Sequence, residues 1–479
     1  MKKKGSVTIY ISLLSSVFLV LFQIMLQSVQ LQGGKIQAVT GVEEGLYSVF
    51  AQFDRELLQK YHVFFMDGGY GTDTLQTGII YQTIADHVEI SCNSQKTLLD
   101  RYGDNLWNLR REMGSITAYT LASDLKGQAF KTQAIDYMKS SVGIQGIQLL
   151  LSGANSGQDI QTETVLQNTV QKVENAKNAY ENAKTQSTEL GEETDKKKNP
   201  LETIRQLQKK GILTLVLPEN AIVSSASINK ETRFSNRTCN QGIGLTYTGV
   251  GTDTYTDKVL FCEYMLQHLT SYGDTTDEIG LAYQLEYVIC GKETDMENLK
   301  SIANRLLATR EAANMVYLTT NTTCQTQIHE LALALTTAVG APALEGVMAL
   351  ALEAAWAFGE SLLDVRTLFE GGEIPLVKTQ ESWRLSLEKL ADLPELLEGK
   401  STNNNNGIGY REYLRMMLLL ENMEQQVFRS MDVVEQTMKN MAGKEYFRWD
   451  LCVSYMEASF EFSCNNINFS VTRDYGYEM

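Results

Sequence analysis

Residues 1–29, MKKKGSVTIYISLLSSVFLVLFQIMLQSV, hold three lysines, and no further charged residue follows until Lys35. A helix that rises about 1.5 Å per residue needs about 20 apolar residues to cross a hydrocarbon core of about 30 Å. The run from Val7 to Leu26 meets this length, and serine hydroxyls within it can bond back to the helix backbone. It therefore predicts a transmembrane helix, with anchoring side chains at Val7, Ile9, Leu13, Phe18, Leu21 and Leu26.

The flanks of this run predict that it stays attached and that it has one orientation. A cleavable signal peptide has an apolar region of about 7–15 residues that ends in an A-x-A-like pattern. The segment after Leu26, QSVQLQGGKIQAV, has no such site. The positive-inside rule keeps Lys2, Lys3 and Lys4 in the cytoplasm. We therefore expect a single-pass protein of the cell membrane, with a cytoplasmic N-terminus and an extracellular bulk.

The composition indicates an acidic protein with enough apolar material for a packed core. It has 42 Lys and Arg residues against 58 Asp and Glu residues, a formal net charge of −16, and 43% hydrophobic residues. A strongly acidic surface repels nucleic acid, so we expect no nucleic-acid partner. The expected partners are the lipid bilayer and other proteins, which would bind the N-terminal helix and the acidic ectodomain.

Changes in pattern along the chain predict four regions. Apolar residues at helical spacing continue from Val39 to about Tyr61, so we expect one long helix that is half in the bilayer and half packed on a folded domain. The run before Pro200 is polar and alanine-bearing, as in an exposed helix. The predicted regions are a transmembrane anchor (1–34), a helical stalk with the first part of the ectodomain (35–158), an exposed helical insertion (159–211) and the main α+β ectodomain (212–479).

Local patterns give expectations for individual elements. The 107–125 region reads as helix, whereas GILTLVLPEN (211–220) and the alternating LAYQLEYVIC (281–290) read as strands. Thr294 and Glu297 form a capping box before a helix. The segment 447–471 predicts a β-hairpin that turns at Asn465–Asn466 and has a bulge near 457–459. The expected fold class is therefore α+β, with an antiparallel sheet that includes this C-terminal hairpin.

The most apolar part beyond the N-terminus is 331–369. Its charge-free portion is too short for a second span, so a buried helical hairpin is the preferred interpretation. Glu345, Glu353 and Glu360 share one helix face. We interpret this face as solvated, and the alternative is a pair of catalytic carboxylates.

The seven cysteines have no C-x-x-C spacing. Two interpretations stay open: buried reduced thiols, or disulfides, with Cys452 and Cys464 as the candidate pair that is closest in sequence. The four histidines include no H-E-x-x-H motif, and no G-x-S-x-G motif occurs. We therefore expect no catalytic, cofactor-binding or metal-binding residues, and no enzyme activity.

Four stretches add a resemblance: KGSVTIYISLLSSVFLVLF, FDRELLQKYHVFFMDGGYG, LEYVICGKETDMENLKSIANRLLATREAANMVYL and AWAFGESLLDVRTLFEGGEIPLVKT. They resemble an uncharacterised domain-of-unknown-function family of Gram-positive gut anaerobes. The N-termini of that family are similar to the TadE/TadG-like pseudopilins of tight-adherence (Flp/Tad) pilus systems. The resemblance implies an envelope role in pilus assembly or in a related secretion system, and it carries no biochemical activity.

One departure from processed prepilins matters. Those proteins have a glutamate five residues into the mature chain, and counting Ser6 as the first residue places Tyr10 there. An assembly or tip component, like TadG, is therefore favoured over a bulk filament subunit. The alternative from another functional class is a membrane-tethered cell-wall hydrolase that uses Glu353 and Glu360.

Overall fold

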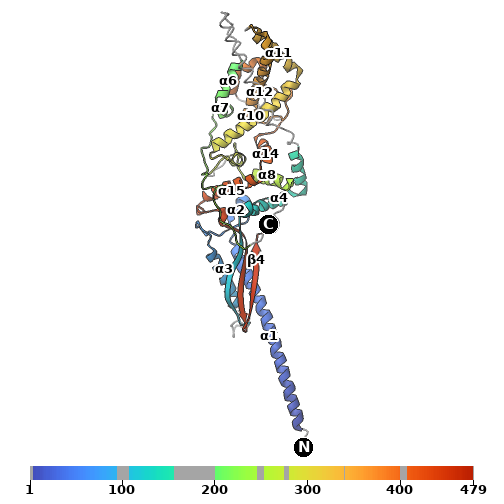
Figure 1. Ribbon diagram of the computed structural model, residues 1–479, viewed down its shortest axis with the longest axis vertical. Helices are drawn as coiled ribbons and strands as arrows, with labels where there is room; N and C mark the ends of the chain where they lie inside the picture. Colours follow the sequence, from blue (N-terminus) through green and yellow to red (C-terminus); the bar gives the residue numbers. More distant parts are fainter. Residues whose placement is uncertain are drawn as a thin grey trace. The chain divides into compact units, whose positions relative to one another are not determined.

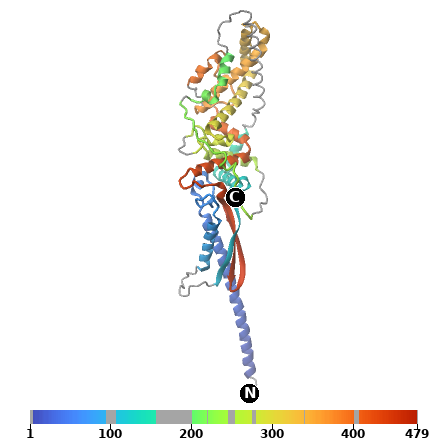
Figure 2. The ribbon, with the colours of Figure 1, turned by 60° about the vertical axis from the view of Figure 1, so that its left-hand side comes forward.

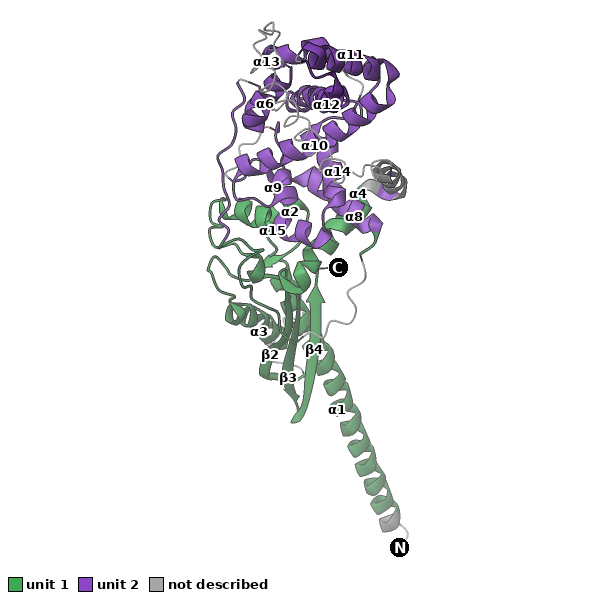
Figure 3. Cartoon of the chain, turned by 45° about the horizontal axis from the view of Figure 1, so that its top comes forward, with its two compact units in different colours: residues 1–141, 231–254, 431–479 green, residues 142–230, 255–430 purple. Residues whose placement is uncertain are grey.

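A computed structural model describes residues 4–93, 107–155, 200–218, 220–244, 253–274, 280–338, 340–399 and 407–477. The chain forms two compact units (Figure 3). Unit 1 combines three segments, Met1–Ser141, Glu231–Thr254 and Met431–Met479, and unit 2 combines Val142–Lys230 with Tyr255–Ser430. Lys2, Lys3 and residues 159–199 of the predicted insertion lie outside the described residues.

Unit 1 is built on one long helix, α1 (Lys4–Phe50), whose N-terminal half projects away from the sheet of the same unit (Figures 1 and 2). The expected long helix is confirmed as far as Phe50. The chain then breaks, and Asp54 caps a separate helix, α2 (Arg55–Tyr61), by accepting hydrogen bonds from the backbone N–H groups of Glu56 and Leu57. A capping carboxylate starts a new helix here because it satisfies N–H groups that have no partner in the first turn.

The second half of α1 packs against α3 (Thr77–Asn93) and the sheet. Its buried residues include Val42, Leu46 and Val49. Two glycines set the distance between the helices: a Cβ on Gly45 would lie 2.9 Å from Ile84 Cγ2, and a Cβ on Gly41 would lie 2.9 Å from Ser91 Cβ. Glycine weakens an isolated helix by up to about 1 kcal/mol, but here its missing side chain lets the two helices approach closely.

The sheet of unit 1 contains β1 (Met66–Asp67), β2 (Leu109–Leu121), β3 (Cys452–Cys464) and β4 (Ile467–Gly476). Strand β3 pairs antiparallel with β2 along one edge and with β4 and β1 along the other. Its side chains alternate: Met456, Ala458, Phe460 and Phe462 are buried in the core with α1 and α3, and the intervening residues form the other face.

The predicted C-terminal hairpin and its turn are confirmed. Asn465 and Asn466 connect β3 to β4 with φ angles of 50° and 65°, the left-handed values of a two-residue hairpin turn. The hairpin itself has no bulge, because the β3–β4 register is continuous from Tyr455–Gly476 to Cys464–Ile467. A register shift does fall opposite Ala458 and Glu457, but it lies in the pairing of β3 with β2. The first predicted strand residues form instead a 3-10 turn, η4 (Trp449–Leu451).

The predicted helix over 107–125 is wrong, because most of this region is β2, followed by the 3-10 turn η1 (Asp124–Lys126). Pairing with β3 decides its structure, since Leu109 to Leu121 bond along almost the whole of that strand. Gly114 packs on Phe460, whose ring would lie 2.3 Å from a Cβ at that position. Tertiary pairing therefore overrides the weak local helical pattern.

Unit 2 is helical in its described part. The predicted strands at 211–220 and 281–290 are wrong: they contain the short helices α7 (Ile212–Val216) and α9 (Gln284–Cys290). Every residue from Gln284 to Ile289 is buried, so the alternation of large side chains does not distinguish an inner face from an outer one. Gly291, with φ 66°, ends α9.

The other elements of unit 2 include the predicted capped helix and the predicted helical hairpin. Thr294 Oγ1 accepts from the N–H of Glu297 at the start of α10. The hairpin of α11 and α12 is confirmed, joined through the 3-10 turn η2 (Pro342–Leu344), and most of α12 is buried. Besides α7 and α9, the described helices of this unit are α6 (Pro200–Lys209), α8 (Tyr255–His268), α10 (Asp295–Thr320), α11 (Thr322–Ala338), α12 (Glu345–Phe369), α13 (Leu393–Glu398) after the 3-10 turn η3 (Leu387–Asp392), and α14 (Tyr410–Leu420). Helices α4 (Gln128–Asn155) and α15 (Met423–Lys439) contribute residues to both units.

Candidate functional site

The exposed half of α1 is the most unusual surface among the described residues. All six predicted anchor side chains are at least 48% exposed: Val7, Ile9, Leu13, Phe18, Leu21 and Leu26. Among the residues that the structure describes, two helical segments are long and apolar enough to cross a membrane. The most apolar window of Val7–Phe50 has a mean hydropathy of 2.3 and is 0% buried, whereas that of Pro342–Phe369 is 78% buried. The first therefore suggests a membrane anchor, and the second is a core helix.

Two serines within the exposed half bond to their own helix. Ser12 Oγ donates to the carbonyl of Ile9 at 2.9 Å, and Ser16 Oγ donates to that of Leu13 at 2.8 Å. The sequence predicted this use of Ser12 and Ser16, and it lowers their cost in an apolar medium. The topology residues Lys2 and Lys3 lie outside the described part, and Lys4 is the first residue of α1.

The sheet meets α1 where its exposed half ends. Asn465 Nδ2, in the β3–β4 turn, donates to Gln30 Oε1 at 2.9 Å, and the Cys464 thiol lies 3.8 Å from the Gln30 carbonyl. The ring of Trp107 covers Gly33, where a Cβ would lie 2.6 Å from it. Sequence reasoning missed this contact, because Gln30 and Asn465 are 435 positions apart. It fixes the base of the exposed half to the hairpin.

The predicted solvated face of α12 is wrong for Glu353 and Glu360, because both are buried. Glu360 Oε1 accepts from Lys378 Nζ at 2.6 Å, and its Oε2 accepts from the N–H of Leu385 at 2.8 Å. Glu353 Oε1 accepts from Gln325 Nε2 at 2.7 Å. These bonds give both carboxylates structural partners, and the complete burial of Glu360 separates it from any polymeric substrate.

Glu360 belongs to a buried charge cluster that also contains Asp364, Arg310, Lys378 and Arg384. Asp364 accepts from Lys378 Nζ at 2.7 Å, Arg384 Nη2 at 2.8 Å and Arg310 Nε at 3.0 Å. Burial alone would raise the pKa of Asp364, but the three cations hold this pKa below its ordinary value. The arrangement links α10, α12 and the segment after α12, and its chemistry is that of a structural ion pair network.

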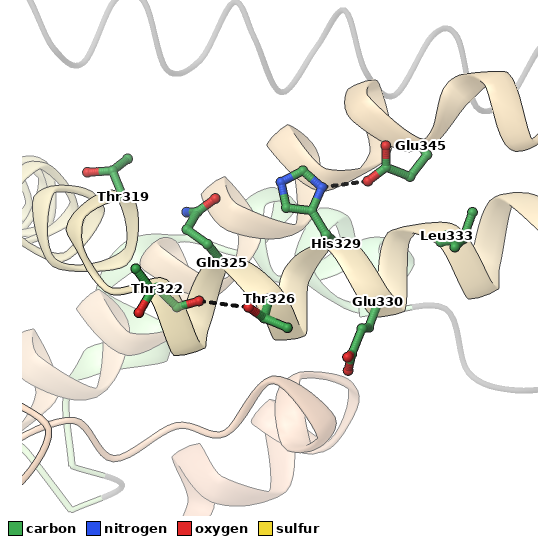
Figure 4. A pocket seen from close by; sticks show the side chains of 8 residues that line it. All are labelled: Thr319, Thr322, Gln325, Thr326, His329, Glu330, Leu333 and Glu345. Atoms are coloured by element: carbon green, nitrogen blue, oxygen red, sulfur yellow. Dashed lines mark hydrogen bonds and ion pairs between the residues drawn. The ribbon is translucent and has the colours of Figure 1, made fainter.

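A shallow pocket lies beside α11, between the end of α10 and the start of α12 (Figure 4). His329 Nδ1 lies 2.5 Å from Glu345 Oε1, and Glu330 points away from that pair. The lining is Thr319, Thr322, Gln325, Thr326, His329, Glu330, Leu333 and Glu345. Within the described ranges, no group of three or more His, Cys, Asp or Glu side chains could hold a metal ion. The pocket therefore supplies no arrangement that points to a particular ligand.

All seven cysteines are free, which agrees with the interpretation as reduced thiols, and the candidate Cys452–Cys464 pair does not form a disulfide. The two residues are the first and last of β3. A strand rises about 3.3 Å per residue, so they lie roughly 40 Å apart along it. Burial raises the pKa of Cys92 to about 11 and that of Cys262 to about 12, which disfavours the reactive thiolate.

Comparison with known proteins links the chain to a protein family. A family model described as a family of unknown function (DUF5702) covers residues 190–464. No curated protein and no solved structure matches the chain. The matched region includes unit 2 from α6 onward and the whole of β3, and α1 lies outside it.

Proposed function

The chain belongs to the DUF5702 family of unknown function, and from that premise we propose that it is a single-pass envelope protein. In this proposal it acts as a structural or assembly component of a tight-adherence-like pilus or a related secretion system. Its N-terminus is cytoplasmic, and its bulk is extracellular. It works through protein contacts made by α1 and by the acidic ectodomain, and we propose no catalytic step.

The observation that carries the proposal is the division of α1 into two halves. From Val7 to Val29 its large apolar side chains are exposed, while from Ala38 onward it supplies the core of unit 1. Covering one large apolar side chain is worth roughly 1.5–3 kcal/mol, so a run of this length is costly in water. A bilayer around the first half removes that cost, and the second half holds the folded domain next to the membrane.

A pilin-like subunit has the same construction, a long N-terminal helix that is half free and half packed on an antiparallel sheet. In unit 1 this sheet is β2, β3 and β4, and it packs on α1 with α3. Tyr10 stands where a processed prepilin has its glutamate. This difference supports an assembly role over bulk incorporation into a filament.

The hydrolase alternative has no observation in its favour. Glu353 and Glu360 are buried and hydrogen-bonded, so neither faces a cleft that would admit a cell-wall polymer. We therefore do not propose it.

Membrane fractionation and topology mapping test the anchor. Leu21→Arg should shift the protein out of the membrane fraction, because a charge at mid-helix costs roughly 2.5–3.5 kcal/mol on insertion. Leu21→Ile is the matched control and should stay in the membrane. Retention of the Leu21→Arg protein would contradict a spanning α1.

Deletion of the gene in the native host tests the role. Surface fibres or secretion should be lost, and they should return with the wild-type chain but not with Leu21→Arg. Unchanged fibres and secretion in the deletion strain would refute the assembly role. Mass spectrometry of the N-terminal peptide adds a distinction: a start at Met1 supports a permanent anchor, and a start at Ser6 supports filament entry.

A further inference from the structure

The exposed half of α1 has one polar face, formed by Ser12, Ser16, Gln23 and Gln27. At about 100° per residue these four positions fall within an arc of about 60°. Residues of the packed half continue the same face: Gln30, Gly34, Gln37 and Gly41 extend the arc only to about 80°. The opposite face carries large apolar side chains, such as Leu14, Leu21 and Met25.

The continuation of the polar face in unit 1 already binds a helix. Gly41 lies against Ser91 of α3, and Gln37 Nε2 donates to the Ser91 carbonyl at 2.7 Å. A small residue permits the close approach there, and an amide makes the hydrogen bond. The exposed half repeats this combination, with small serines first and two amides after them.

The two amides of the exposed half lack a bond of this kind. Within the part of the chain that the structure describes, Gln23 and Gln27 have no hydrogen-bond partner. Ser12 and Ser16 bond to their own helix and so present a small, satisfied surface. In a bilayer, helices associate through small residues and interhelical hydrogen bonds, because apolar side chains pack equally well against lipid.

The room beside this face limits what can occupy it. At the level of Gln30 the face is taken by Asn465 and Cys464, and α3 follows at Gln37. A second copy of α1 would have to continue past this level, because the helix is unbroken to Phe50. A helix that ends or turns at the membrane surface can lie along the exposed half of α1, on the N-terminal side of the hairpin contact at Gln30.

We propose that the polar face of α1 binds a transmembrane helix of a different membrane protein. That helix ends near the level of Gln30, and it offers a hydrogen-bonding side chain beside Gln23 and Gln27. The inference rests on the proposed function, since it requires α1 to lie in the bilayer.

Site-specific photo-cross-linking of the full chain in native membranes tests this assignment. Leu19 lies on the arc of the polar face, and Leu21 lies opposite; both are exposed leucines, so a benzophenone amino acid at each makes a matched pair. The Leu19 probe should give an adduct whose other peptide is an apolar segment of another protein, in at least tenfold higher yield than the Leu21 probe.

A second variant separates partner binding from membrane insertion. Gln23→Leu with Gln27→Leu makes α1 more apolar, so the protein should stay in the membrane fraction while the Leu19 adduct falls several-fold to about tenfold. Met25→Leu is the control and should leave the adduct unchanged. Four results would each overturn the inference. They are equal adduct yields from the two probes, an adduct with a second copy of this chain, no adduct at all, and an adduct that survives the double substitution. Loss of the wild-type chain from the membrane fraction would instead contradict the proposed function.

Discussion

Replacing Asp364 by asparagine should be among the most destabilising single changes in unit 2. The carboxylate is fully buried and lies within 3.0 Å of nitrogen atoms of Lys378, Arg384 and Arg310. Asparagine keeps the shape but removes the charge and turns one acceptor oxygen into a donor. The five-residue cluster then has three cations against Glu360 alone, a formal charge of +2 in place of +1.

The expected cost follows from leaving buried cations uncompensated, which is roughly 3–5 kcal/mol. A domain is stable by about 5–15 kcal/mol, so the loss is a large share of the total. Hydrogen exchange on peptides from α12 measures it without a signal from unit 1. Because about 1.4 kcal/mol is a tenfold change, exchange through opening of unit 2 should become roughly 10²- to 10⁴-fold faster.

Two comparisons make this prediction refutable. Asp392→Asn changes an exposed aspartate with no side-chain capping bond, so it should alter exchange by less than about 0.5 kcal/mol. Adding Lys378→Met to Asp364→Asn returns the cluster to a formal +1, so the double variant should lose less than the sum of the two single losses. A loss below about 1 kcal/mol for Asp364→Asn, or strict additivity in the double variant, would refute the electrostatic reasoning.

Three further predictions concern pH, helix packing and the hairpin turn. Burial raises the pKa of Glu286 to about 7, so this group favours the folded state below the pKa of the unfolded chain, near 4.5, and that stability is lost as the pH rises toward 7. Glu286→Gln should remove about 2.5 kcal/mol of the difference in unfolding free energy between pH 5 and pH 8, measured in urea. The part due to Glu311, whose pKa burial also raises to about 7, should remain, and an unchanged pH profile would contradict the prediction. Gly45→Val should lower thermal stability by about 1–3 kcal/mol, because its side chain meets α3, whereas Gly78→Ala on α3 has open space and should be neutral or stabilising. Asn466→Gly should preserve the hairpin and Asn466→Val should cost about 1–2 kcal/mol, measured by denaturant unfolding, because φ at this position is 65°.

The sequence predicts elements whose signal is local. The exposed half of α1 follows from composition, the start of α10 from the spacing of Thr294 and Glu297, and the hairpin turn from Asn465–Asn466. It does not predict β2, because the partner that makes it a strand is far away in the chain: Thr117 bonds Glu457, 340 positions later. The alternating large side chains of 281–290 also led to the wrong prediction of a strand where α9 lies. A helix that is buried on all sides needs no helical spacing of its apolar residues, so its sequence can alternate like that of a strand.

The buried carboxylates show a second limit. Their spacing on α12 placed them on one helix face, but it did not tell which groups cover that face. A usable signal was present, because Glu360 and Asp364 lie in an otherwise apolar helix and cations follow at Lys378 and Arg384. Charged residues within an apolar helix are buried only with partners, and Lys378 and Arg384 are two of those partners. Sequence proximity alone does not identify them, because Arg366 lies nearer and pairs with Glu370.

The order in which the chain is made has a consequence for unit 1. Helix α1, α3 and β2 leave the ribosome early, but the strand that covers them, β3, follows about 340 residues after Thr117. At about 5–20 residues per second, this delay is roughly 20–70 s. For that time the sides of α1 and α3 that later face β3, and the edge of β2, lack the apolar contacts and hydrogen bonds that β3 supplies. Chaperones that shield such intermediates, and proteases that remove stalled ones, therefore have a defined interval in which to act on this chain.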